Sequence, residues 1–104
     1  MAELTSNIFY NMGTCYFILM SFRYAIKLYD QAIMIKPNYV KAIQNRALGH
    51  MKEGNLLSAC EDIKLAYKYD KQSFLIQNDL KKIEGAYYNS YKHQDHRFLK
   101  KYTF

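Results

Sequence analysis

Few side chains in this chain are spaced so that they could do chemistry together. His93 and His96 are three residues apart, which would place both imidazoles on one helix face, as a metal site requires. Only these two ligands converge, so we expect a solvated segment and no metal. Cys15 and Cys60 lack the spacing of a metal site and lie in helical patterns, which predicts two reduced, packed thiols. His50 falls at a position expected to face the core, where we predict a packed histidine.

No group of residues has the spacing of a catalytic centre. The sequence contains no glycine-rich phosphate loop, no nucleophile elbow and no Cys–His pair supported by spacing. Its isolated carboxylates fit exposed helix faces or helix ends. Examples are Asp30, Glu53, Glu61 and Asp62. We therefore expect that the protein is not an enzyme and needs no cofactor.

Two stretches of the sequence follow the same pattern, separated by about 34 residues. The first stretch contains Phe9, Met12, Gly13, Tyr16, Ala25, Tyr29, Ala32 and Pro37. The second stretch has equivalent residues at five of these places, which are Ile43, Ala47, Ala59, Ile63 and Ala66. A fixed period of this length indicates paired helices in a stacked repeat, an architecture that presents a long surface for binding.

Helix signals predict where each element begins and ends. Ser6 or Thr5 should cap the first helix, and Asn38 the third. Pro37 should end the second helix because proline lacks an amide hydrogen. Gly54 suits the left-handed residue that follows a helix. The expected helices span about 6–19, 22–36, 39–52 and 56–69.

Small residues predict where these helices approach each other closely. Gly13 should face Ala25 in the first pair, and Ala47 should face Ala59 in the second. Larger residues should fill the spaces between the helices, namely Phe9, Tyr16, Tyr29, Ile43 and Ile63.

The segment after residue 72 is amphipathic but does not repeat the pattern. Ser73 can cap it, and an apolar stripe follows at helical spacing. That stripe consists of Ile76, Leu80, Ile83, Tyr87 and Tyr91. We predict a capping helix over about 73–92 that covers the open edge of the stack. Residues 93–104 should form a basic tail that is frayed or lies on another surface.

With these residues the chain resembles the tetratricopeptide repeat family. The first stretch matches the family pattern of aromatic, large, glycine, tyrosine, alanine, aromatic, alanine and proline. The second departs from it at Arg46, His50 and Lys71, and Met20 stands where glycine is common. The resemblance implies an all-α, right-handed α-solenoid within a single domain, 1–104. Its parts would be two helix-turn-helix repeats, about 4–37 and 38–71, and the capping helix and tail.

The resemblance also implies a binding site, because the first helix of each pair lines a concave groove in this family. By position, the groove residues are Asn7, Tyr10, Asn11, Thr14, Phe17, Lys41, Gln44, Asn45, Leu48 and Lys52. The Asn11 and Asn45 amides can bond both the N–H and the C=O of an extended peptide. Lys41 and Lys52 would attract an acidic or C-terminal segment. Solvated polar side chains on a groove wall are the alternative interpretation.

Some relatives hold the C-terminal tails of chaperones with a two-carboxylate clamp. Asn11 and Lys41 lie where that clamp has an asparagine and a lysine, whereas Asn45 lies where it has an arginine. A preceding repeat with a further lysine and asparagine is absent from this sequence. The resemblance therefore implies an incomplete clamp.

These patterns predict a non-catalytic interaction module, such as an adaptor, a scaffold or a co-chaperone-like protein. A cytoplasmic location is expected, because the sequence shows neither a secretory signal nor an apolar run near the ~20 residues of a membrane span. The net charge of +6 leaves an RNA-binding repeat protein as an alternative, although nucleic acid is not the expected partner. A structural subunit of a larger assembly or a homo-oligomer is the other alternative. The tail residues that bear on these alternatives are Lys92, Arg97, Phe98, Leu99, Lys100, Lys101 and Phe104.

Overall fold

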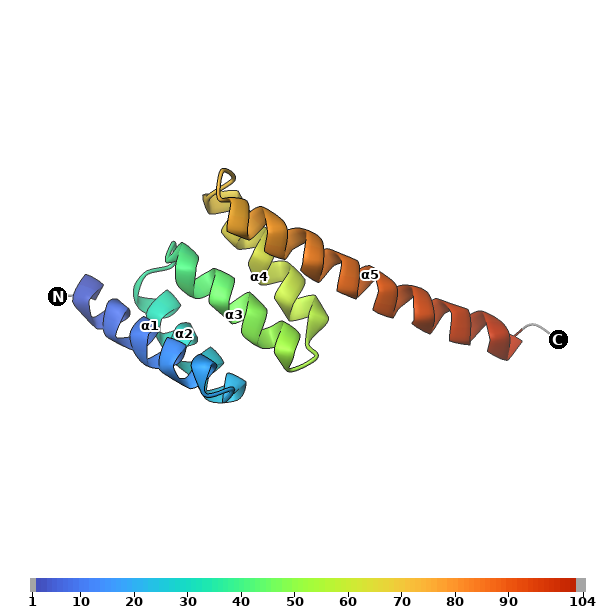
Figure 1. Cartoon of the computed structure of the whole chain (residues 1–104), viewed down its shortest axis with the longest axis horizontal. Helices are drawn as coiled ribbons and strands as arrows, with labels where there is room; N and C mark the ends of the chain where they lie inside the picture. Colours follow the sequence, from blue (N-terminus) through green and yellow to red (C-terminus); the bar gives the residue numbers. More distant parts are fainter. Residues whose placement is uncertain (1, 103–104) are drawn as a thin grey trace.

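The computed structural model describes the backbone of residues 2–102 and the side chains of residues 2–90. Its described part contains five α-helices and no strand, as Figure 1 shows. The helices are α1 (Ala2–Ile18), α2 (Phe22–Ile35), α3 (Val40–Lys52), α4 (Leu56–Tyr69) and α5 (Phe74–Tyr102). Each helix packs against the next one along the chain. The predicted all-α class is confirmed.

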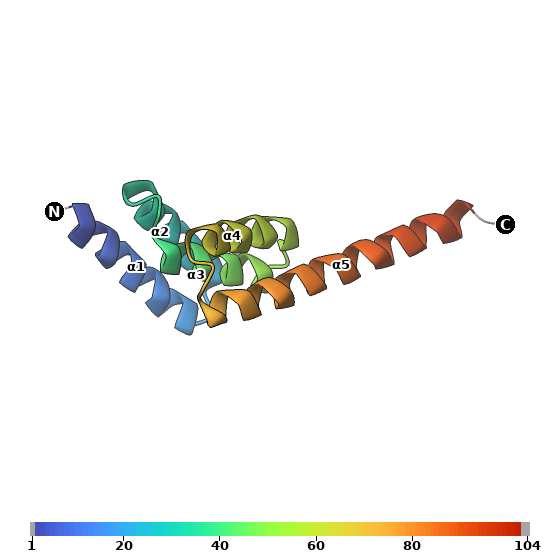
Figure 2. The same ribbon diagram turned by 90° about the horizontal axis from the view of Figure 1, so that it is seen from above.

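The helices are stacked as two antiparallel pairs, α1–α2 and α3–α4, followed by α5. Within the described residues, α1 contacts α3 and α3 contacts α5, whereas α2 and α4 do not contact each other. The helices α1, α3 and α5 therefore share one face of the stack, which we call the α1/α3/α5 face. Figures 1 and 2 both show that α5 extends well beyond the other four helices, so the molecule measures 63 × 29 × 20 Å.

The turns between α1 and α2 and between α3 and α4 have the same backbone geometry. Met20 has a φ of 62° and Gly54 a φ of 83°. The next amide in each turn, of Ser21 or Asn55, donates to the carbonyl five residues back, at 2.9 and 2.8 Å. This bond and the left-handed residue define a Schellman motif. The prediction for Gly54 is confirmed, and Met20 adopts the same conformation although it carries a side chain.

Two predicted helix caps are wrong. Helix α1 begins at Ala2, so Ser6 lies inside it, fully buried, and donates from Oγ to the Glu3 carbonyl at 2.9 Å. No helix-breaking residue precedes Ser6, and a serine inside a helix can bond a carbonyl of the turn before it. Asn38 is exposed, and Tyr39 occupies the N-cap of α3 without a side-chain cap bond. The Ser73 cap is confirmed, because the Ile76 amide donates to Ser73 Oγ at 3.3 Å.

The core consists of two buried clusters that the predicted small residues make possible. A Cβ atom at Gly13 would lie 2.8 Å from Tyr29 Cε1 and 3.2 Å from the Ala25 carbonyl oxygen, which confirms the close approach of α1 to α2. The first cluster lies between α1, α2 and α3 and contains Ala25, Tyr29, Ala32 and Ala42. The second joins α3, α4 and α5 and contains Ile43, Ala47, Ala59, Cys60, Ile63, Ala66, Ile76 and Ile83.

Two side chains of α1 that were expected to be packed are exposed. Tyr16 was predicted to fill space between helices, yet 39% of it is exposed, and its ring meets Tyr24 at a centroid distance of 5.6 Å. Cys15 was predicted to be packed but is also exposed. Among the described helices only α2 and α3 contact α1, and neither of them buries these two side chains. Cys60 is buried as predicted, and burial raises the pKa of its thiol.

The last helix continues to Tyr102, past the predicted end near residue 92. Ile76 and Ile83 of its predicted stripe are buried against α4, whereas Tyr87 is exposed. The side chains of Tyr91, His93, His96 and the basic residues that follow lie outside the described part of the chain. Among the residues that are described, no His, Cys, Asp and Glu side chains form a cluster suited to a metal ion. No described helix is long and apolar enough to cross a membrane.

Candidate functional site

The structure joins α1 and α3 through stacked and hydrogen-bonded tyrosines. The Tyr39 hydroxyl donates to Asn7 Oδ1 at 2.8 Å. The Tyr39 ring stacks on that of Tyr10, with 5.1 Å between ring centroids. Tyr39 stands at the start of α3, so this contact fixes where α3 begins relative to α1. Burial, followed by the nearby Tyr10 and Glu3, raises the pKa of Tyr39.

A second set of polar contacts surrounds the hydroxyl of Tyr29, which α2 inserts between α1 and α3. Tyr29 is fully buried, and its hydroxyl lies 3.0 Å from Thr14 Oγ1. Asn45 Nδ2 donates to the Tyr29 hydroxyl at 3.4 Å and to the Tyr10 hydroxyl at 3.3 Å, both near the upper limit for hydrogen bonds. Burial raises the pKa of Tyr29, and the bonds from Thr14 and Asn45 partly oppose that rise.

The remaining predicted groove residues fall into two groups. Gln44 Nε2 donates to Asp79 Oδ2 at 2.9 Å, which ties α3 to α5. Phe17 meets the edge of Phe22, with ring centroids 5.1 Å apart, and Leu48 packs against the second cluster. The side chains of Asn11, Lys41 and Lys52 are exposed and form no hydrogen bond or ion pair within the described part of the chain.

The structure therefore brings most of the predicted residues together, but many of them hold the helices in place. The sequence interpretation missed Tyr29, Tyr39 and Asp79 as polar partners at this face. A signal for Tyr29 was available, because a buried tyrosine hydroxyl needs a hydrogen-bond partner. No comparable signal existed for Asp79, because its contact with Gln44 depends on how α5 docks on α3.

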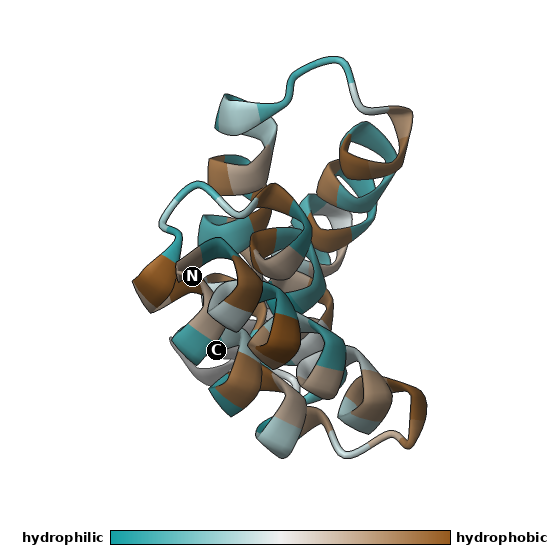
Figure 3. Ribbon diagram, turned by 90° about the vertical axis from the view of Figure 1, so that its left-hand side faces the viewer, coloured by the Kyte–Doolittle hydropathy of each residue, from teal (hydrophilic) through white to brown (hydrophobic). Residues whose placement is uncertain are grey.

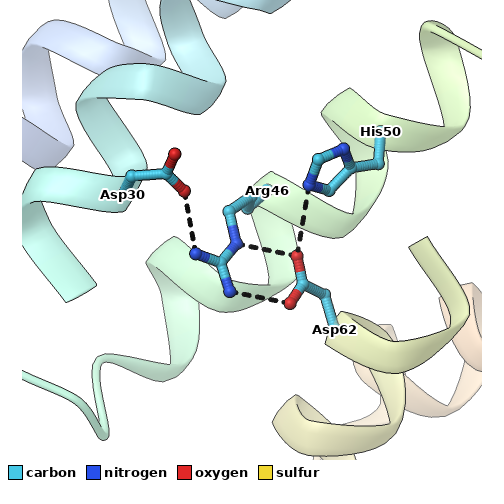
Figure 4. Close-up of polar contacts among 4 residues, drawn as sticks. All are labelled: Asp30, Arg46, His50 and Asp62. Carbon is cyan, nitrogen blue, oxygen red and sulfur yellow. Dashed lines mark hydrogen bonds and ion pairs between the residues drawn. The ribbon is translucent and has the colours of Figure 1, made fainter. Parts of the chain in front are cut away.

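Arg46 forms a separate polar cluster, shown in Figure 4. Its Nε and Nη2 donate to the two carboxylate oxygens of Asp62 at 2.7 and 2.8 Å. Its Nη1 donates to Asp30 Oδ1 at 2.8 Å. Hydrogen bonding to Asp62 is the main reason why the pKa of Arg46 is raised. Asp62 was expected to lie on an exposed helix face, which is wrong: it is buried and paired with an arginine of the neighbouring helix.

His50 completes this cluster and borders a cavity. Its Nε2 lies 3.7 Å from Asp62 Oδ2, and its Nδ1 is buried with no hydrogen-bond partner among the described residues. The open cavity has a volume of about 520 Å³, between α2 and the α3–α4 turn. Arg23, Ile26, Lys27, His50, Glu53 and Asn55 line it. Because Arg46 bonds to carboxylates of α2 and α4, we assign the cluster a structural role, namely to hold three helices together.

Stacked helix pairs joined by tight, equivalent turns define a helical-repeat protein. The sequence model of the tetratricopeptide repeat matches residues 6–39. A solved structure of similar fold is the first TPR of Spaghetti (RPAP3) bound to the HSP90 peptide SRMEEVD, with a TM-score of 0.75 and 25% sequence identity. Another is the Sgt2 TPR domain from Aspergillus fumigatus, with a TM-score of 0.76 and 25% identity. The first helix pair thus matches the tetratricopeptide repeat, and about four fifths of the chain shares the fold of these two tetratricopeptide repeat structures.

These matches differ in how much of each protein they cover. The similarity to RPAP3 covers 78% of this chain and 64% of that one, and the similarity to Sgt2 covers 81% and 56%. This chain thus spans less than two thirds of the length of either structure. A comparison with curated proteins finds no match.

Proposed function

We propose that this chain is a non-catalytic protein-interaction module that binds an extended peptide on its α1/α3/α5 face. The proposal rests on the amides of Asn11 and Asn45, which occupy equivalent positions on α1 and α3. The Asn11 side chain is exposed and unbonded within the described chain, and the hydrogen bonds of Asn45 use only its Nδ2. Each amide can therefore still accept a bond from a peptide N–H, and Asn11 can also donate one.

The charges near these amides favour an acidic peptide or a C-terminal carboxylate. Lys41 and Lys52 are exposed on α3 and make no ion pair with described residues, whereas Asp79 is already bonded to Gln44. The RPAP3 structure contains a peptide with this character, SRMEEVD. Asn45 lacks the charge of an arginine, so we expect the carboxylate to be bound more weakly here than by a complete clamp. The predicted cytoplasmic location is part of this proposal.

A binding titration with matched peptides tests the proposal. Fluorescence anisotropy would compare labelled SRMEEVD that has a free C-terminal carboxylate with the same peptide amidated at that end. We expect the free acid to bind more tightly. The Asn11→Ala/Asn45→Ala variant should lose about tenfold in affinity or more, since each hydrogen bond is worth about 1 kcal/mol. Asn38→Ala, which removes an exposed amide between α2 and α3, should bind like the wild type.

Folding must be monitored in the same samples. Asn45 also bonds to Tyr10 and Tyr29, so circular dichroism and the melting temperature of the double variant are compared with those of the wild type. Equal binding by the wild type and a folded double variant would place the peptide elsewhere. If neither peptide binds, capture from a lysate with the two proteins side by side would show whether the face recognises another segment. Identical recoveries would refute the assignment of this face.

A further inference from the structure

The contact between α2 and α3 shows which surface of a repeat's first helix faces the preceding repeat. Ala42 of α3 is fully buried in the first cluster. Gly49 lies so near α2 that an added Cβ would be 3.0 Å from Ile26 Cγ1. Arg46, between them, bonds to Asp30 of α2. The side of α3 that carries these three residues is thus the side that docks on the preceding helix.

The same side of α1 is apolar and uncovered. One repeat earlier, the positions of Ala42, Arg46 and Gly49 are occupied by Ile8, Met12 and Cys15. Ile8 is 50% exposed and Met12 is 44% exposed. With Leu4 and Tyr16 they form a surface that we call the α1 patch, defined by residues 4, 8, 12 and 16. Figure 3 views the molecule from the end at which α1 lies, with each residue coloured by its hydropathy.

We infer that the α1 patch binds a second copy of this chain, which would form a two-fold dimer. The charge distribution is suited to this partner. Glu3 is the only charged residue of α1, and it pairs with Lys36 Nζ at 3.6 Å. Every other helix carries Lys or Arg, and the whole chain has a net charge of +6. The α1 patch is therefore a surface through which two copies can meet without bringing their positive charges together.

The spacing of the patch suits contact with itself. Residues four apart form a ridge on a helix, and two such ridges interdigitate when the helices cross at about −50°. A two-fold axis near the middle of the ridge places Met12 of one copy close to Ile8 and Met12 of the other. The contact closes on itself, so it forms a dimer and not an open filament.

The size of the contact limits its strength. A helix with the length of α1 spans about 25 Å, so one helix–helix contact buries much less than the ~800 Å² per partner of a stable interface. We therefore expect a dissociation constant of about 100 μM. Sedimentation equilibrium from about 5 μM to about 1 mM covers that value, and the average mass should rise from 12.4 kDa towards twice that mass.

Two lysine variants distinguish a charge placed in the α1 patch from the general effect of adding a positive charge to the chain. Met12→Lys should weaken self-association by about tenfold or more, because two ammonium groups would meet near the axis. The helix should tolerate lysine there, since Met12 is 44% exposed and lysine has a high helix propensity. Met34→Lys adds the same charge at a residue of α2 that is 75% exposed, and it should leave the dissociation constant unchanged.

A mixing experiment then tests the two-fold arrangement. Met12→Glu alone should also remain monomeric, but an equimolar mixture of Met12→Lys and Met12→Glu should regain the dimer. Recovery of the dimer in the mixture supports contact of the α1 patch with its own copy. Three results would each overturn the inference: a wild type that is monomeric at the highest concentration, a Met34→Lys variant weakened as much as Met12→Lys, or no recovery in the mixture.

Discussion

Arg46 is a charged residue at a position that is apolar in the first repeat, and its contacts show how the charge is accommodated. Its guanidinium group bonds to Asp62 with two nitrogens and to Asp30 with the third. The Arg46 and Asp62 side chains are only 20% and 10% exposed, so neither charge is compensated by water alone. The equivalent positions of the first repeat hold Met12 and Leu28. The two repeats thus have an apolar pair and a charged pair at the same two positions.

This correspondence predicts strong coupling between Arg46 and Asp62. Arg46→Met should lower the free energy of unfolding by about 3 kcal/mol, because it leaves the Asp62 carboxylate buried without its main partner. Asp62→Leu should also be destabilising, because it leaves the Arg46 guanidinium group without its main partner. Arg46→Met/Asp62→Leu, which copies the first repeat, should return to within about 1 kcal/mol of the wild type. Urea denaturation of the four proteins measures the coupling, and additive losses in the double variant would contradict it.

The sequence identified Arg46 as a departure from the repeat but not its partners. Asp30 lies sixteen residues before it and Asp62 sixteen residues after it. Such pairs meet only when the helices on both sides have docked, so local pattern could not reveal them. The exposure of Tyr16 has a related cause. Its position is buried only when another helix covers α1, and the sequence pattern does not show whether one does.

At the level of the elements, the two tight turns set the angle at which each helix pair closes. Both use a left-handed residue, which is Met20 in the first pair and Gly54 in the second. A residue with a Cβ atom is strained in this conformation by about 1 kcal/mol, whereas glycine is not. The 74%-exposed Met20 side chain can gain little from packing that would offset the strain.

Exchanging the two residue types should shift stability in opposite directions. We expect Met20→Gly to raise the free energy of unfolding by about 1 kcal/mol and Gly54→Ala to lower it by about as much. Leu19→Gly is the matched control, because Leu19 is equally exposed but does not have a positive φ. That variant should be destabilised. Thermal unfolding measures all three, and a Met20→Gly variant that melts no higher than Leu19→Gly would refute strain at this turn.

Most helix boundaries could be predicted because breaking residues mark them. Pro37, Gly54 and the polar residues after Tyr69 end helices close to the predicted places. The start of α1 and the end of α5 were missed, since the sequence has no proline or glycine near either point. The predicted groove residues were placed on their helices by the resemblance to the repeat family. Their hydrogen-bond partners, such as Asp79, depend on how α5 docks.

In the whole molecule, α5 substitutes for a further repeat. The second cluster is closed on one side by Ile76 and Ile83, which are 2% and 0% exposed. The Cys60 thiol donates to the Ile83 carbonyl oxygen at 3.9 Å, and Gln44 bonds to Asp79. The helix therefore completes the core and also borders the face proposed to bind peptides. Loss of α5 should affect stability and binding together.

A chain that ends at Gln72 tests this dependence. Without α5, the apolar side chains that α3 and α4 bury against it become exposed, and each repeat relies on its neighbour for a closed core. We expect the shortened chain to lose cooperative thermal unfolding and to bind a hydrophobic dye. Ile83→Asp should reproduce part of this loss within the full chain, whereas Tyr88→Asp, at a 63%-exposed site on the same helix, should not. A shortened chain that melts cooperatively near the wild-type temperature would show that the two helix pairs are stable without their cover.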